Sequence, residues 1–295
     1  MPPVIPTMTV RVRSAAAFTS LTLPGARARI DGMCTVVVRV DPGSVWPVTV
    51  LALRDESPER PWDPPAAWWP DRDPGVRGVR DRAAGGAWLA ASDRAGLAVV
   101  LNRGEPVPTA DGTWTTRGVV PVDAVADGLL PGHDGTLPTT RAFNLVRATA
   151  DGAAVLTWDG TRVRTTELGP GVHMVTHGEP DDPSSPRIGR WLEAFRAVDA
   201  PVGPPVLGPF DELRSVDAGD DAGDGWGGWF GVLAESAALP SDHPDAILRD
   251  AHEAEGHMTT LSIVAAAIGA ERTVLQHARL TEPGRLDGSV ELHRA

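Results

Sequence analysis

The sequence predicts an α+β domain built in layers and dominated by antiparallel strand pairs. Three observations predict it: strand-like segments come in consecutive pairs, short turns join the members of each pair, and helical segments stand apart from the pairs. A doubly wound parallel sheet needs strands and helices in regular alternation, and the sequence has no such alternation.

The first strand pair begins at Cys34. The segment CTVVVRV is rich in β-branched residues, DPGS is typical of a turn, and VTVLAL is a second apolar run. Residues 34–53 therefore predict a hairpin. The same kind of pattern predicts later strand pairs over residues 85–102, 142–160 and 259–280.

Helices are predicted between these strand pairs. Residues 121–130 have proline in their first turn, and residues 184–200 have a serine cap followed by apolar residues at helical spacing. We also expect residues 243–256 to be helical. Two segments without a period are predicted as loops: a proline- and tryptophan-rich one over 57–82, and an acidic, glycine-rich one over 216–228.

Composition argues against several classes of protein. The 295 residues carry a formal net charge of −12, which argues against a nucleic-acid binder, because phosphates must be met by clustered positive charge. The longest apolar run, Leu261–Ala270, is too short to span a bilayer, so we expect no transmembrane segment. The single cysteine, Cys34, excludes internal disulfides and suits a cytoplasmic location. All basic residues other than histidine are arginine, which indicates a GC-rich genome that we expect to be bacterial.

The place of Cys34 directly after Met33 raises the question of where the working chain begins. Residues 1–33 contain several arginines around a middle too polar for a signal peptide, and we expect them to be a leader or a mis-assigned start. Translation from Met33, followed by removal of that methionine, would make Cys34 the first residue of a single domain over 34–295. We therefore expect the mature chain to lack residues 1–33.

A cysteine at the amino terminus has a specific chemistry. Its α-amine titrates near pH ~8 and its thiol near ~8.5, so the amine can take the thiol proton. Arg54 and Asp55 end the second strand of the first hairpin, where they can stabilise a thiolate and hold the α-ammonium. Asn102 ends another strand, and its amide can donate to a developing oxyanion. Taken singly, such residues are more typical of surface ion pairs and turns.

Several motifs, in this order, resemble one family. They are MCTVVVRVDPGSVWPVTVLALRDESPERP, GGAWLAASDRAGLAVVLN, TTRGVVPVDAVADGLL, RAFNLV and GPGVHMVTHGEPDDPSSPR. From Met33 to about Asp287 the chain is similar to the NRDE family, the homologues of transport and Golgi organisation protein 2.

The resemblance implies a fold like that of the N-terminal-nucleophile hydrolases, a layered αββα sandwich of two mostly antiparallel sheets. Related amide hydrolases attack an amide with such a cysteine. This implies Cys34 as nucleophile, Arg54 and Asp55 as its supports, and Asn102 in the oxyanion site. The implied substrate is a small-molecule amide, with no cofactor and no metal.

The chain departs from the family pattern at three positions. Leu53 and His177 stand where the family has asparagine, and Met258 stands where it has arginine. His177 can still donate a hydrogen bond to an oxyanion, so we keep it as a candidate site residue, but Met258 cannot replace a cation.

Two other hypotheses stay open. NRDE members are also linked to Golgi organisation, lipid homeostasis and haem transfer, which implies a non-catalytic binding or transfer protein for haem or another apolar ligand. Trp62, Trp68 and Trp69 share one segment where they can cover such a ligand. The candidates for an axial haem ligand are His173, His177, His252, His257 and Cys34. The third hypothesis is that Cys34 only begins a buried strand. The sequence does not predict the oligomeric state.

Overall fold

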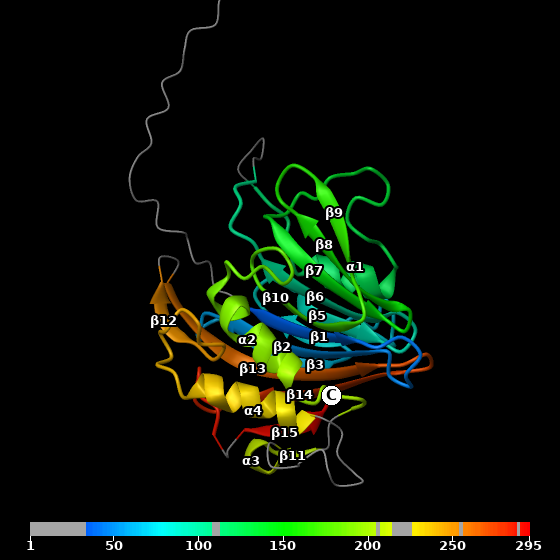
Figure 1. The fold of residues 1–295 in the computed structure, drawn as a ribbon. Coiled ribbons are helices and arrows are strands. Elements are labelled where there is room, and N and C mark those ends of the chain that lie inside the picture. Colours follow the sequence, from blue (N-terminus) through cyan, green and yellow to red (C-terminus); the bar gives the residue numbers. More distant parts are fainter. Residues whose placement is uncertain (1–33, 108–112, 205–206, 214–225, 254–255, 288–289) are drawn as a thin grey trace, which may run out of the picture.

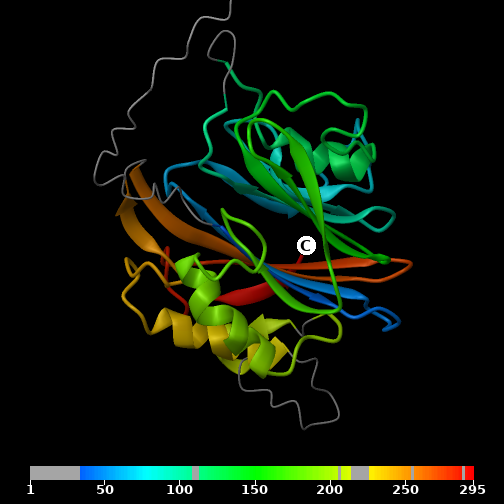
Figure 2. The same cartoon turned by 45° about the horizontal axis from the view of Figure 1, so that its top comes forward.

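Two β-sheets, lying against each other as layers, form the body of the protein (Figures 1 and 2). The computed structural model describes residues 34–107, 113–204, 207–213, 226–253, 256–287 and 290–295. Within these ranges every pairing between strands is antiparallel. The predicted leader, residues 1–33, lies outside the described residues.

The first sheet has the strand order β10-β1-β2-β13-β14-β15-β11, with β12 also paired to β13. Its strands are β1 (Thr35–Val40), β2 (Val48–Glu56), β10 (Gly171–Val175), β11 (Gly208–Pro209), β12 (Asp250–Glu253), β13 (Gly256–Ile268), β14 (Thr273–Arg279) and β15 (Glu291–Arg294). β1 and β2 form the predicted first hairpin, in which Thr35 lies opposite Leu53. Because β13 is the other neighbour of β2, the end of β2 lies between two strands and is buried.

The second sheet follows the chain order β3-β4-β5-β6-β7-β8-β9. Its strands are β3 (Trp62–Ala66), β4 (Arg77–Asp81), β5 (Ala87–Ser92), β6 (Gly96–Asn102), β7 (Phe143–Thr149), β8 (Gly152–Trp158) and β9 (Val163–Leu168). Consecutive strands joined by short connections need no crossover, which is why local sequence pattern predicts the β5–β6 and β7–β8 pairs well.

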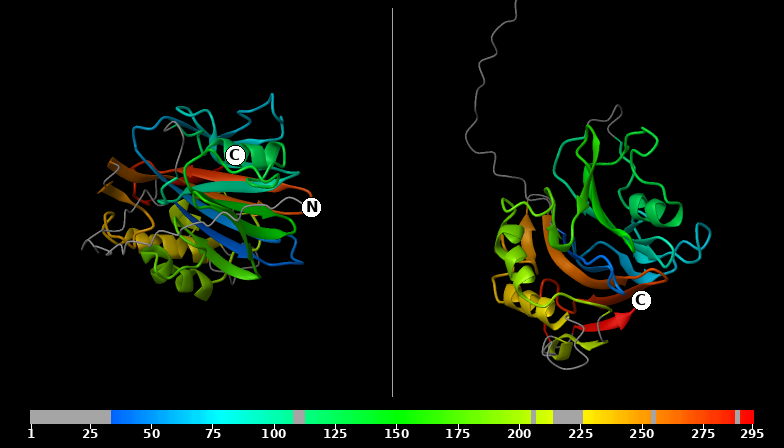
Figure 3. Two further views of the ribbon diagram at one scale, coloured as in Figure 1. Left: turned by 90° about the horizontal axis from the view of Figure 1, so that it is seen from above. Right: turned by 45° about the vertical axis from the view of Figure 1, so that its right-hand side comes forward.

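Helices lie on the outer faces of both sheets. α2 (Pro186–Ala197), α3 (Phe210–Leu213) and α4 (Trp226–Ala237) lie on the side of the first sheet, and α1 (Val119–Ala126) packs on β5 and β6. Figure 3, right, shows α2 and α4 on one side and α1 on the other, with the sheets between them. The predicted α+β class with two antiparallel sheets is confirmed. In the described part of the chain, no helix is long and apolar enough to cross a membrane.

Side-chain alternation along β1 separates two cores. Val36 and Val38 point into the core between the sheets, while Val37 packs with the apolar faces of α2 and α4. Cys34 has the same parity as Val36 and belongs to the core between the sheets. The pleat of β1 therefore turns the thiol toward the space between the sheets.

The strand pairs over 34–53, 85–102, 142–160 and 259–280 are confirmed as β1–β2, β5–β6, β7–β8 and β13–β14. Two helix predictions are confirmed: the helix predicted over 121–130 spans Val119–Ala126, and the one predicted over 184–200 spans Pro186–Ala197. The second begins with proline, and its Ser185 hydroxyl bonds the hydroxyl of Thr176 at 3.1 Å without capping the helix.

Three other predictions were wrong. The described part of the segment predicted as helical over 243–256 contains no helix: turns lead into β12, whose four residues pair with β13. Residues 57–82 are not one long loop, because they include β3 and β4, and β3 tolerates its two prolines because it is an edge strand. The acidic loop over 216–228 ends earlier than predicted, since α4 begins at Trp226, and its residues 216–225 lie outside the described residues.

Two glycines let α1 approach β5 closely. A side chain at Gly86 would collide with the backbone of Gly118, and the amide of Ala87 donates to the carbonyl of Gly118 at 2.7 Å. This contact joins the GGAW and TRG motifs, and Ala87 and Gly118 also border the pocket described next.

Candidate active site around Cys34

Cys34 lies immediately before β1 and is almost completely buried, with 8% of its surface exposed. Its Sγ donates a weak hydrogen bond to the backbone carbonyl of Asp55 at 3.6 Å. Burial raises the pKa of the Cys34 thiol to about 12, and the negative charge of Asp55 adds to this effect. In this state the sulfur is a protonated thiol at neutral pH.

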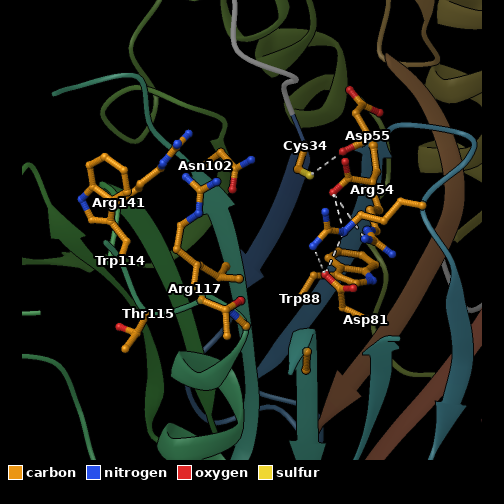
Figure 4. Close-up of a pocket in the computed structure, with 16 residues that line it drawn as sticks. Cys34, Arg54, Asp55, Asp81, Trp88, Asn102, Trp114, Thr115, Arg117 and Arg141 are labelled. Carbon is orange, nitrogen blue, oxygen red and sulfur yellow. Dashed lines mark hydrogen bonds and ion pairs between the residues drawn. The ribbon is translucent and has the colours of Figure 1, made fainter. Parts of the chain in front are cut away.

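A pocket of about 410 Å³ lies beside Cys34. Figure 4 shows its two walls: Cys34, Arg54, Asp55, Asp81 and Trp88 lie on one side, and Asn102, Trp114, Thr115, Arg117 and Arg141 lie on the other. The first wall comes mainly from β2, β4 and β5, and the second from the end of β6 and the segments flanking α1 and β7. Four of the five predicted site residues thus border one pocket: Cys34, Arg54, Asp55 and Asn102.

The Asp55 carboxylate points away from the thiol and into a buried polar cluster. Arg187 of α2 donates from Nη2 to Asp55 and from Nη1 to the Thr35 hydroxyl, both at 2.7 Å, and Thr260 donates to Asp55 at 2.5 Å. The side chains of Arg187 and Asp55 are 0% and 1% exposed. Burial raises the pKa of Asp55, while the positive charge of Arg187 opposes the rise. Asp55 therefore meets Cys34 through its backbone carbonyl and anchors α2 through its carboxylate.

Arg54 brings a cation to the same wall as Cys34. Its side chain is 3% exposed, and Nη2 lies 3.5 Å from Glu56. Nη1 is buried without a hydrogen-bond partner among the described residues. A buried guanidinium with an unsatisfied donor is costly on its own, so this atom is suited to an anionic or carbonyl group of a ligand.

The two asparagines of the chain have different surroundings. Asn144 is fully buried on β7. Its amide nitrogen donates to the backbone carbonyls of Thr176 at 3.0 Å and Gly178 at 2.6 Å. Its amide oxygen accepts hydrogen bonds from Arg103 and Thr157. It therefore fastens the turn after β10 to the second sheet. Asn102 lines the pocket, and within the described residues its side chain makes no hydrogen bond, which leaves its amide available to a ligand.

His177 does not line the pocket. It lies two residues beyond the end of β10, and its Nδ1 is buried without a partner among the described residues. Burial lowers the pKa of His177, and the positive charges of Arg187 and Arg103 lower it further, so the imidazole is neutral near neutral pH. Its predicted contribution to an oxyanion site stays a prediction.

The other two departures from the family pattern lie in strands. Leu53 is fully buried in the core beneath α2 and α4. Met258 lies opposite Ala251 in the β12–β13 hairpin and does not border the pocket. Positive charge reaches Asp55 instead from Arg187 and from Arg249, which is itself buried and bonded to Glu253 at 2.8 Å.

Sequence reasoning missed Arg187, Arg249 and Thr260. Arg187 lies at the start of a predicted helix, on the same face as its apolar residues. That position was the one sign in the sequence that this arginine is buried. Nothing in the local sequence of Arg249 or Thr260 distinguishes them from surface residues.

The candidate haem ligands are dispersed. His173 bonds Asp181 at 2.7 Å, and the rings of His252 and His257 stack on the β12–β13 hairpin. None of the four histidine candidates borders the pocket at Cys34, and neither do Trp62, Trp68 and Trp69, whereas Trp88 and Trp114 do. Within the described ranges, no group of three His, Cys, Asp or Glu side chains is arranged to hold a metal ion.

The fold and the site together define a class: a two-sheet layered protein whose polar pocket is built against a cysteine at the start of an interior strand. Residues 33–199, more than half of the 295-residue chain, match the family described as Transport and Golgi organisation 2, and the chain belongs to this family. The match includes Cys34, Arg54, Asp55, Asn102 and His177. No curated protein matches the chain.

Proposed function

We propose that this protein is a hydrolase of small amides with a fold of the N-terminal-nucleophile type, and that Cys34 is its nucleophile when it is the first residue of the chain. One observation carries the proposal: the Cys34 thiol, Arg54 with an unpartnered Nη1, and the Asn102 amide border the same pocket. A nucleophile, a cation beside it and a hydrogen-bond donor across from it are the groups that acyl transfer requires.

The amino terminus supplies the missing base. With a thiol pKa of about 12, Cys34 preceded by a peptide bond has almost no thiolate at neutral pH. A free α-amine on Cys34 would accept the thiol proton, and the resulting ammonium and the nearby Arg54 would stabilise the thiolate. We expect the chain with a peptide bond before Cys34 to be inactive for this reason.

The reaction follows in two steps. The thiolate attacks the amide carbon to form a C–S bond, the carbonyl oxygen becomes an oxyanion that the Asn102 amide can meet, and the C–N bond breaks as the α-ammonium protonates the leaving amine. Water, deprotonated by the α-amine, then attacks the thioester, and the acid leaves as the thiol is restored. Arg187 and Thr260 hold Asp55 and β2 in place beneath this site.

The pocket gives less support to the alternative, a binding or transfer protein for haem or another apolar ligand. Seven charged residues border it, and no histidine does. A wholly apolar ligand would leave these charges desolvated without partners. Haem could place its propionates against the arginines, but of its candidate axial ligands only Cys34 borders this pocket. We further propose a cytoplasmic location, where a lone thiol stays reduced.

The test is amide turnover by the chain beginning at Cys34. A panel of small N-acyl amides is screened for release of the amine. Acid-quenched samples are analysed by mass spectrometry for an acyl group on the first tryptic peptide. We expect turnover and an acyl–Cys34 adduct, both abolished by Cys34→Ala. Turnover that survives Cys34→Ala, or a panel without any turnover by a chain shown to begin at Cys34, would refute the proposal.

A further inference from the structure

The pocket at Cys34 is cationic in a protein that is strongly anionic. The chain has a formal net charge of −12, yet four arginines and three acids border the pocket. The arginines are Arg54, Arg60, Arg117 and Arg141, and the acids are Asp55, Glu56 and Asp81. Such a local reversal of charge favours ligands that carry negative charge.

Each of the three acids already has an arginine partner. Asp55 pairs with Arg187 at 2.7 Å, Asp81 with Arg60 at 2.7 Å, and Glu56 with Arg54 at 3.5 Å. The acids are therefore neutralised by arginines on their own wall or behind it, and none of these pairs crosses the pocket to Arg141.

Arg141 stands on the wall that faces Cys34. Its guanidinium lies over the ring of Trp114, 4.8 Å from the ring centroid, and it forms no ion pair with any described carboxylate. Stacking on an aromatic face fixes the plane of a guanidinium while leaving its edge open for two parallel hydrogen bonds to an oxyanion. A second unpartnered donor, Nη1 of the 3%-exposed Arg54, lies on the opposite wall beside the thiol (Figure 4).

We propose that the ligand of this pocket is an amide whose far end carries a carboxylate or phosphate group, and that Arg141 binds that group while the amide lies at Cys34. The assignment of the amide end rests on the proposed function; the anionic end rests on Arg141, Trp114 and the paired acids. Arg141 is thus a specificity-determining residue, because a neutral amide of the same length gains nothing from it.

The test compares probes that differ only at the far end. Succinamate, glutaramate and 3-phosphonopropionamide carry an amide and an anion, and succinamide and glutaramide are their neutral counterparts. Binding is measured by ligand-observed NMR and calorimetry on the full-length chain with Cys34→Ala, so that no turnover interferes. Arg141→Gln is the test variant, and Arg162→Gln, an exposed arginine that does not border the pocket, is its control.

We expect one of the anionic probes to bind at least about tenfold more tightly than its neutral counterpart, and Arg141→Gln to remove this preference while Arg162→Gln keeps it. A preference for the phosphonate over both carboxylates would identify a phosphate-bearing ligand, and the reverse a carboxylate-bearing one. Equal binding of anionic and neutral probes, or equal effects of the two substitutions, would overturn the inference. Since these measurements need no turnover, failure of the hydrolase proposal leaves their outcome interpretable.

Discussion

Replacing Arg187 by methionine tests the buried ion pair that holds β2 and α2 together behind Cys34. The change removes hydrogen bonds of 2.7 Å to Asp55 and to the Thr35 hydroxyl and leaves the Asp55 carboxylate buried without its cation. Methionine fills a similar volume, so the loss of charge, and not a cavity, dominates the effect.

The magnitude follows from the burial of both groups. A hydrogen bond to a charged group contributes about 1.5–3 kcal/mol, and breaking one partner of a fully buried pair costs about 3–5 kcal/mol, because the remaining charge stays desolvated. We therefore expect Arg187→Met to lower the free energy of unfolding by about 3–5 kcal/mol. Asp55→Asn combined with Arg187→Met should recover a large part of this loss, because no unpaired charge then remains.

The loss should depend on pH in a defined direction. Burial raises the pKa of Asp55, and without Arg187 nothing as strong opposes the rise. Below the ordinary aspartate pKa of ~3.9 both the folded and the unfolded state carry the proton, and the penalty disappears. The penalty grows as pH rises from there toward the raised pKa of the folded state, and it stays constant at higher pH. Urea unfolding of both variants at pH 5 and pH 8 measures this. A loss under about 1 kcal/mol, or a larger loss at pH 5 than at pH 8, would refute the reasoning.

Three further predictions concern single residues. With a peptide bond before it, Cys34 should react with iodoacetamide at pH 7 about 1000-fold more slowly than a thiol of pKa 9.0, because its pKa of about 12 leaves that much less thiolate. The chain beginning at Cys34 should react faster than the longer chain, and equal rates for these two chains would contradict the prediction. Burial lowers the pKa of His277 to about 4, below its ordinary 6.5, so the folded state resists protonation. The free energy of unfolding should therefore fall by up to about 3 kcal/mol as pH falls from 6.5 to 4. In urea titrations His277→Phe should flatten this pH dependence, and an unchanged dependence would count against the prediction. Gly86→Ala should cost about 1–3 kcal/mol, because the new methyl group meets the Gly118 backbone; a variant melting at the wild-type temperature would show that α1 can shift freely.

Local pattern was sufficient for the parts of the fold that are local. The β1–β2 hairpin was predictable because its turn lies between two apolar, β-branched runs that fix the register, and the same register brings Cys34 close to Arg54 and Asp55. Asn102 was predictable only as the end of a strand, since its place across the pocket depends on how the sheets stack.

The parts that failed depend on contacts between distant segments. Asp55 bonds Arg187 over 132 residues and Thr260 over 205, and no local pattern carries that information. Asp250–Glu253 form a strand only because β13 pairs with them, which overrides the helical character of the segment. Trp62 packs against His277 and lines a second pocket, and Trp68 and Trp69 line another, so their predicted role in covering a ligand stays a prediction.

The central claim is that Cys34 acts as nucleophile only with its own α-amine free. The most direct measurement is the rate of amide hydrolysis by the chain beginning at Cys34, compared with the same chain in which Met33 still precedes Cys34, each form verified by intact mass. We predict turnover in the first form and none in the second, since only the first has a base beside a thiol that burial otherwise keeps protonated. Equal turnover in the two forms would contradict the claim.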